Sequence, residues 1–186
     1  MVDLPALWMP ILLSAVIVFV LSSIIHMATP WHRDDFRRLP DEEKVMDALR
    51  PFALPPGAYA APRSSSMAEM SSPAWADKVR RGPNLMLQVM RNEPTSMGRN
   101  LALWFLYSVV IGVFAAYVTG RAVGPGTKYL TVFRFAGTTA FLGYAVGLWQ
   151  TSIWYQRSWA ITLRTTIDGL IYALFTAGTF GWLWPR

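Results

Sequence analysis

Four long apolar stretches constrain most strongly what this chain can fold into. A membrane-spanning helix needs about 20 apolar residues, because each residue advances the helix by about 1.5 Å. The four stretches cover residues 7–27, 101–120, 129–150 and 165–184. Tryptophan or tyrosine stands near their ends, as in the aromatic belts of membrane interfaces. The sequence therefore predicts an all-α membrane protein with a bundle of four transmembrane helices.

The composition supports this fold class. Only 15% of the residues are charged and 53% are hydrophobic, whereas a soluble domain carries about 25% charge. The chain has no cysteine, which excludes disulfides, zinc–thiolate sites, iron–sulfur clusters and a cysteine nucleophile. The formal net charge of +6 is distributed as in a membrane protein, so we expect no nucleic-acid partner.

The positions of lysine and arginine predict the orientation. Most of them lie between residues 28 and 100, whereas residues 1–8 contain Asp3 and no basic residue. Cytoplasmic connections are the ones enriched in lysine and arginine. We therefore expect a first transmembrane helix within residues 1–28 with its amino end outside. A cytoplasmic loop over 29–100 and three further helices within 101–186 would follow, with the carboxyl end outside. An acid in place of a basic n-region argues against a cleaved signal peptide.

The long loop contains signals for short elements. Residues 41–50 read as an amphipathic helix capped by Asp41 and ended by Pro51, and residues 51–73 as an irregular connector rich in proline and serine. Ser72, Pro73 and Gly82 suit the start and end of a second helix. Residues 84–94 fit either a strand or an interfacial segment.

Small residues recur at every fourth position in three of the stretches. Such ridges let transmembrane helices approach closely. The positions that we assign to helix packing are Ser108, Gly112, Ala116, Gly143, Gly147, Gly169, Ala173, Ala177 and Gly181. The ridges predict either a tight four-helix bundle or docking to the helices of another membrane protein.

Ionisable residues at membrane depth are candidates for function, because they are costly to bury there. His26 and Asp168 fall at similar depths near the cytoplasmic side, and Arg164 lies one turn before Asp168. A cluster of these three could relay protons or hold a headgroup phosphate. The favoured alternative is structural: an Arg164–Asp168 pair at the helix end, with His26 at the interface. Arg134 lies near the outer surface and is expected to snorkel outward.

The stretch "HMATPWHRDD" (residues 26–35) contains the only two histidines of the chain. His26, His32, Asp34 and Asp35 offer nitrogen and oxygen ligands for a divalent ion. Pro30 leaves their geometry unspecified, and no further histidine completes a common site. We therefore interpret the stretch as the end of a transmembrane helix and predict no metal and no cofactor.

Three blocks of the sequence resemble a group of uncharacterised bacterial four-span inner-membrane proteins. They read "PWHRDDFRRLPDEEKVMDALR", "SMGRNLALWFLYSVV" and "SIWYQRSW…DGLIYALFTAGTFGWLWPR". The resemblance implies a multi-pass protein of the bacterial inner membrane. It brings no known activity, cofactor or catalytic residue.

No nucleotide-binding glycine loop, nucleophile elbow or paired-carboxylate site occurs in the sequence. The leading hypothesis is therefore a non-enzymatic accessory or assembly subunit that docks on another integral membrane protein or on a second copy of itself. The alternative is a small oligomeric transporter or channel that uses His26, Arg164 and Asp168. An enzyme acting on lipid at the cytoplasmic surface, with His26 as base, ranks third.

Overall fold

A computed structural model of the chain describes residues 1–186 as a mostly helical protein. It contains two compact units. Residues 1–36 and 96–186 together form the first, which we call the helical unit. Residues 37–95 form the second, which we call the loop unit.

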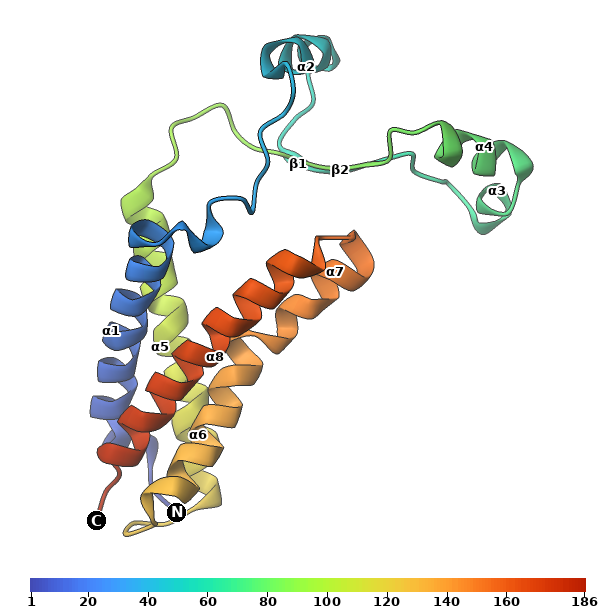
Figure 1. The fold of residues 1–186 in the computed structure, drawn as a ribbon. Coiled ribbons are helices and arrows are strands. Elements are labelled where there is room, and N and C mark those ends of the chain that lie inside the picture. The colour runs from blue at the N-terminus through green and yellow to red at the C-terminus, as the bar shows by residue number, and fades with distance from the viewer. The chain divides into compact units, whose positions relative to one another are not determined.

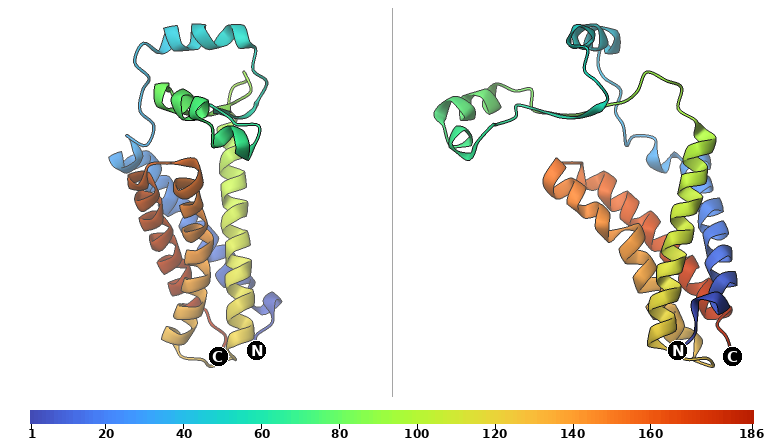
Figure 2. Two further views of the ribbon diagram at one scale, coloured as in Figure 1. Left: turned by 90° about the vertical axis from the view of Figure 1, so that its right-hand side faces the viewer. Right: turned by 180° about the vertical axis from the view of Figure 1, so that it is seen from behind.

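Four long helices make up the helical unit, and they lie side by side (Figure 1). Helix α1 packs against α5 and α8, and α6 packs against the same two helices. Both chain termini lie at one end of the unit (Figure 2). The elements in chain order are η1 (Leu4–Leu7), α1 (Trp8–Ser23), η2 (Ile24–Ala28), η3 (Pro30–His32), α5 (Met97–Ala122), α6 (Tyr129–Tyr144), η5 (Val146–Leu148), α7 (Trp149–Tyr155) and α8 (Trp159–Trp182).

The small-residue ridges pack inside this unit. Ser108, Ala116, Ala173 and Ala177 are all buried. A Cβ on Gly112 would lie 3.3 Å from Ile11 of α1, one on Gly169 2.7 Å from the Cβ of Ala145, and one on Gly181 2.7 Å from the Tyr129 ring. Gly143 faces Ile111, whereas nothing lies within 4 Å of a Cβ on Gly147. Of the two predicted uses of the ridges, the tight bundle accounts for every position except Gly147.

Two helices are long and apolar enough to span a membrane. They are the continuous helical run Leu4–Ala28, of 25 residues, and Met97–Ala122, of 26 residues. Each contains one of the predicted stretches, 7–27 and 101–120. Helix α8 covers most of the fourth stretch but begins at Trp159, so that Arg164 lies inside the helix rather than in the connection before it.

The prediction of one continuous helix over residues 129–150 is wrong. Helix α6 ends at Tyr144, and the backbone breaks at Ala145 before η5 and α7. The carbonyl of Gly143 accepts a hydrogen bond of 2.7 Å from the Tyr107 hydroxyl of α5. The Tyr107 hydroxyl therefore occupies a carbonyl that would accept a backbone N–H if α6 continued past this point. Gly169 of α8 also approaches the backbone of Tyr144 and Ala145 at this point.

The loop unit consists of short elements around one antiparallel hairpin (Figure 1). Strands β1 and β2 pair from Gly57 opposite Val89 to Ala61 opposite Leu85. The strand interpretation of residues 84–94 is therefore the correct one. The bounds are α2 (Glu42–Leu49), η4 (Arg50–Phe52), β1 (Gly57–Ala61), α3 (Met67–Met70), α4 (Pro73–Arg81) and β2 (Leu85–Val89).

The predicted N-terminal cap is correct for α4 and wrong for α2. Ser72 caps α4 by accepting a hydrogen bond from the backbone N–H of Trp75 at 3.1 Å, as predicted. Asp41 does not cap α2: its backbone is left-handed, with φ of 53°, and its carboxylate pairs with Lys44 instead. The irregular connector predicted over residues 51–73 contains β1 and α3, because pairing with β2 orders the "GAYAA" segment despite its weak strand propensity.

No side chain of the loop unit is buried. Large apolar side chains remain open, with Phe52 69% exposed, Met67 77% and Met90 75%. Local hydrogen bonds hold the elements instead. The backbone and the hydroxyl of Ser65, for example, hydrogen-bond Glu69 and lower the pKa of its carboxyl. The loop unit has regular structure without a hydrophobic core.

Candidate functional site

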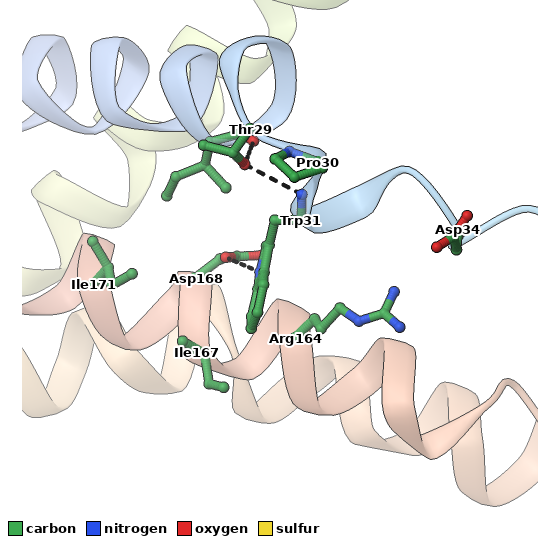
Figure 3. A pocket seen from close by; sticks show the side chains of 9 residues that line it. Thr29, Pro30, Trp31, Asp34, Arg164, Ile167, Asp168 and Ile171 are labelled. Atoms are coloured by element: carbon green, nitrogen blue, oxygen red, sulfur yellow. Dashed lines mark hydrogen bonds between the residues drawn. The ribbon is translucent and has the colours of Figure 1, made fainter.

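A polar cluster lies where α1 ends, between that end and α8. The last turn of the α1 run, η2, is a wider π-helical turn, a feature frequent at functional sites. Thr29 then leaves the helix and accepts a hydrogen bond from the Trp31 N–H at 3.4 Å, and Pro30 starts the 3₁₀ turn η3. This turn brings the Trp31 indole to Asp168 of α8 (Figure 3), and it brings the His32 ring to the same carboxylate.

Asp168 is the centre of the cluster and is only 4% exposed. Its Oδ1 accepts a hydrogen bond of 3.0 Å from the Trp31 indole N–H. Its Oδ2 lies 2.8 Å from Nε2 of His32. Both carboxylate oxygens therefore have partners from the residues just after α1, which satisfies the acceptors of a buried carboxylate.

A second carboxylate supports the first through His32. The Nδ1 of His32 lies 2.7 Å from Oδ2 of Asp35, and Arg164 pairs with the other oxygen of Asp35. Burial raises the pKa of Asp35, but the hydrogen bonds and positive charges of His32 and Arg164 outweigh this effect and hold the pKa below its usual range. Asp35 is therefore an ionised acceptor on the far side of the His32 ring.

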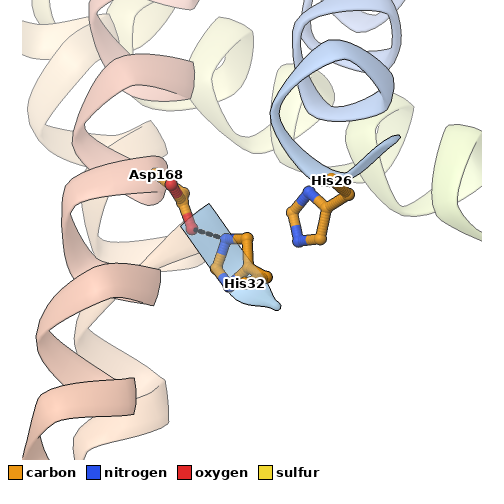
Figure 4. Close-up of side chains that lie close together, drawn as sticks. All are labelled: His26, His32 and Asp168. Atoms are coloured by element: carbon orange, nitrogen blue, oxygen red, sulfur yellow. Dashed lines mark hydrogen bonds and ion pairs between the residues drawn. The ribbon is translucent and has the colours of Figure 1, made fainter. Parts of the chain in front are cut away.

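His26 completes the cluster from the π-helical turn (Figure 4). Its ring stacks on that of His32, with centroids 4.3 Å apart and planes 9° apart. Its Nδ1 lies 2.9 Å from the carbonyl oxygen of Ser22. A carbonyl only accepts, so Nδ1 donates and the lone pair of the neutral ring is on Nε2. One nitrogen or oxygen from each of His26, His32 and Asp168 lies within 4.8 Å of the others.

Two pockets adjoin Asp168. One, of about 570 Å³, is lined by Trp31, Arg164 and Ile171 among others. The second, of about 650 Å³, is lined by His26 and by the aromatic side chains of Trp104, Tyr107, Tyr144 and Tyr172. The hydroxyl of Tyr172 is buried and has no hydrogen-bond partner. The cluster therefore adjoins two open pockets, and polar side chains of the cluster form part of the lining of each.

The structure brings together all three residues of the predicted cluster, with different partners. Arg164 pairs with Asp35 and not with Asp168, so the predicted Arg164–Asp168 pair is wrong. His32 and Asp35, which the sequence analysis assigned to a helix end, are central members, and Asp34 is not hydrogen-bonded within the cluster. The one signal for them in the sequence is their position directly after the helix break at Pro30.

Comparison of the chain with protein families, curated proteins and solved structures found no match. The resemblance to bacterial four-span inner-membrane proteins therefore stays a prediction. What the site can do follows from its geometry: it joins the end of α1 to α8, and it places ligand atoms of two imidazoles and a carboxylate within 4.8 Å of one another.

Proposed function

We propose that this chain is a four-span protein of the bacterial inner membrane and an accessory or assembly subunit that docks on another membrane protein. The observation that carries the proposal is the loop unit, which has regular structure but buries no side chain. The proposal rests on two separate arguments, one for the membrane placement and one for the docking.

The two helices that are long and apolar enough to span a membrane support the membrane placement, and the lengths of the other two long helices add to it. Helix α8 has 24 residues and measures about 36 Å, enough for a hydrocarbon core of about 30 Å. Helix α6 has 16 residues, or about 24 Å, and needs η5 and α7 to complete a crossing. The outward-facing leucine and phenylalanine side chains of these helices, such as Leu130 and Phe175, suit contact with lipid.

The docking argument concerns the hairpin and the helices of the loop unit. One face of β2 exposes Met86, followed in the same register by Met90, at 58% and 75%. Unpaired apolar side chains on an ordered surface mark sites of association, and methionine adapts to varied partners. The small-residue ridges no longer support docking, because they pack within the helical unit. The loop unit is therefore the surface on which a partner subunit would bind.

The test is isolation of the tagged full-length protein from native membranes in mild detergent, with mass spectrometry of what remains bound. We expect a stoichiometric membrane subunit with the natural sequence and its loss with the double substitution Met86→Ser and Met90→Ser. Gln88→Ser, on the same face of the strand, is the matched control and should retain the partner. A monomer or homo-oligomer with no foreign subunit would overturn the proposal.

The second candidate, a small transporter or channel, is favoured by the two pockets beside Asp168. Complementation of a deletion strain separates the two functions. If the protein is an accessory subunit, Asp168→Asn should restore function to the deletion strain and the Met86 and Met90 double variant should not. If it is a transporter, the double variant should restore function and Asp168→Asn should not. Membrane levels of each variant are measured in parallel, so that loss of protein is not counted as loss of function.

A further inference from the structure

We propose that His26, His32 and Asp168 form a binding site for a divalent transition-metal ion of the zinc class. The proposal goes beyond the accessory function and does not depend on it. Three ligand groups from two separate parts of the chain, the end of α1 and the middle of α8, lie within 4.8 Å of one another (Figure 4). Metal sites are commonly assembled in this way, with side chains from facing helices of a bundle.

Each proposed ligand side chain has two polar atoms, one for the metal and one facing away from it. In all three side chains the second atom has a hydrogen-bond partner that orients the group. His26 donates from Nδ1 to the Ser22 carbonyl, which leaves Nε2 for the ion. His32 has Asp35 at Nδ1 and Asp168 at Nε2. Histidine ligands typically donate their second ring N–H to a carboxylate or a backbone carbonyl, which fixes the tautomer and orients the ring. Both kinds of partner are present here.

Asp168 and Asp35 are held in the same manner. Trp31 donates to Oδ1 of Asp168 at 3.0 Å, which leaves Oδ2 on the side of His32. Arg164 pairs with Asp35 and so fixes the carboxylate behind the histidine. Once His32 has released its Nε2 proton, the two carboxylates outnumber the Arg164 guanidinium by one charge, and this negative balance suits a doubly charged cation.

The chemistry of ion uptake is an exchange of a proton for the metal. The His32 ring lies between two carboxylates that only accept hydrogen bonds when ionised, so both of its nitrogens carry protons in these contacts. On binding, the proton leaves Nε2 to solvent, and the metal bonds to the lone pair of Nε2 and to Oδ2 of Asp168. The proton on Nδ1 remains hydrogen-bonded to Asp35.

The geometry needs only side-chain adjustment. A zinc ion with bonds of about 2.0–2.2 Å holds tetrahedral ligand atoms about 3.4 Å apart, compared with at most 4.8 Å here. The His26 ring is exposed and stacked on His32, so it tilts to bring its Nε2 toward the ion. A set of two histidines and one carboxylate leaves a fourth position open. His26 and Asp168 both line the pocket of about 650 Å³, where that position would lie.

The test is titration of purified full-length protein in detergent with Co²⁺ and Zn²⁺, using an affinity tag without histidine. Visible d–d absorption of Co²⁺ reports the coordination geometry, and calorimetry gives the Zn²⁺ affinity. We expect one ion per chain, with loss of the absorption bands in His26→Gln and Asp168→Asn. Asp35→Asn, which alters the support of His32 and the pair with Arg164 but no proposed ligand, should weaken binding by about 10–100-fold.

Asp34→Asn is the matched control, because Asp34 adjoins the site without a hydrogen bond to it, and its affinity should equal that of the natural sequence. His26→Gln keeps the test decisive even if Asp168→Asn fails to fold, because His26 is exposed and its side chain makes a single hydrogen bond. Absence of one-to-one binding in the natural sequence, or equal affinity in His26→Gln, would overturn the proposal.

Discussion

The helical unit and the loop unit both contain helices, and they differ in what their elements enclose. Helices α1, α5, α6 and α8 bury small residues against one another, and the cluster around Asp168 has its polar atoms paired. Helices α2, α3 and α4 and the two strands contain no fully buried residue. Residues 37–95 therefore form regular secondary structure through local hydrogen bonds and strand pairing. Closely packed, buried side chains occur only in the helical unit.

The difference teaches where the stability of each region comes from. In the helical unit a substitution acts through neighbours that cannot move away, because interiors are close-packed. In the loop unit it acts on one turn or one cap, since side chains there have solvent on several sides. Substitutions of the same chemical type should therefore have unequal effects in the two regions, and the following predictions use that inequality.

The largest effect is expected from removing a buried carboxylate. Asp168→Ala leaves Trp31 and His32 without their acceptor and should destabilise the helical unit by about 3 kcal/mol or more. Asp77→Ala removes a carboxylate whose ion pair with Arg80 is largely exposed, which should cost less than about 1 kcal/mol. Thermal unfolding in detergent, followed by size-exclusion chromatography, measures both. Similar losses would mean that the cluster is not a buried unit.

A smaller effect is expected from the glycines. Gly169→Leu forces apart α8 and the backbone at Tyr144 and Ala145, at a cost of about 1–3 kcal/mol. A Cβ added at Gly147 meets nothing within 4 Å, so Gly147→Leu should be nearly neutral. The same unfolding assay compares the two variants. A strong effect of Gly147→Leu on partner capture, with stability unchanged, would show that this one position of the ridges faces another chain.

A still smaller loss of stability is expected from removing a single hydrogen bond between α5 and α1. The Trp104 indole N–H donates to the Ser22 hydroxyl at 2.7 Å. Trp104→Phe keeps an aromatic ring and removes the donor, which should lower the free energy of unfolding by about 0.5–1.5 kcal/mol. Denaturant titration in detergent gives the value. No change would imply that Ser22, which also bonds the Phe19 carbonyl, needs no second partner.

The smallest effect on the whole protein is expected from a cap in the loop unit. Ser72→Ala removes the cap of α4, worth about 1 kcal/mol locally, and should leave the unfolding temperature of the helical unit unchanged. Hydrogen exchange should be several-fold faster in α4 and unaltered in α5. A shift of the helical unit's unfolding temperature would break the comparison, because it would couple the two units.

Much of the fold could be predicted from hydrophobic length. The two helices long and apolar enough to span a membrane agree with the predicted stretches to within a few residues at each end, since an apolar run with defined breaks leaves few alternatives. The break at Ala145 could not be predicted, because it depends on the Tyr107 hydroxyl and on Gly169, both distant in sequence. The hairpin was only half predicted, since "LMLQV" has the pattern of a strand and its partner "GAYAA" does not.

Three members of the site could be predicted from the sequence, but the other members and the pairing could not. His26, Arg164 and Asp168 stood out as ionisable residues in apolar surroundings. Which carboxylate Arg164 would bind depended on the chain reversal at Pro30, and proline gives only the fact of a break and not the direction taken after it. His32 and Asp35 were therefore assigned to the solvent side of a helix end.

The two connections between the helical unit and the loop unit are held in different ways, because the polar cluster lies next to only one of them. At the entrance after Phe36, the preceding residues Asp35 and His32 are fastened to α8. At the exit, the chain enters α5 through a single serine cap at Ser96. The connection into the loop unit is therefore anchored to α8 by side-chain contacts, whereas the connection out of it continues into α5 through the main chain.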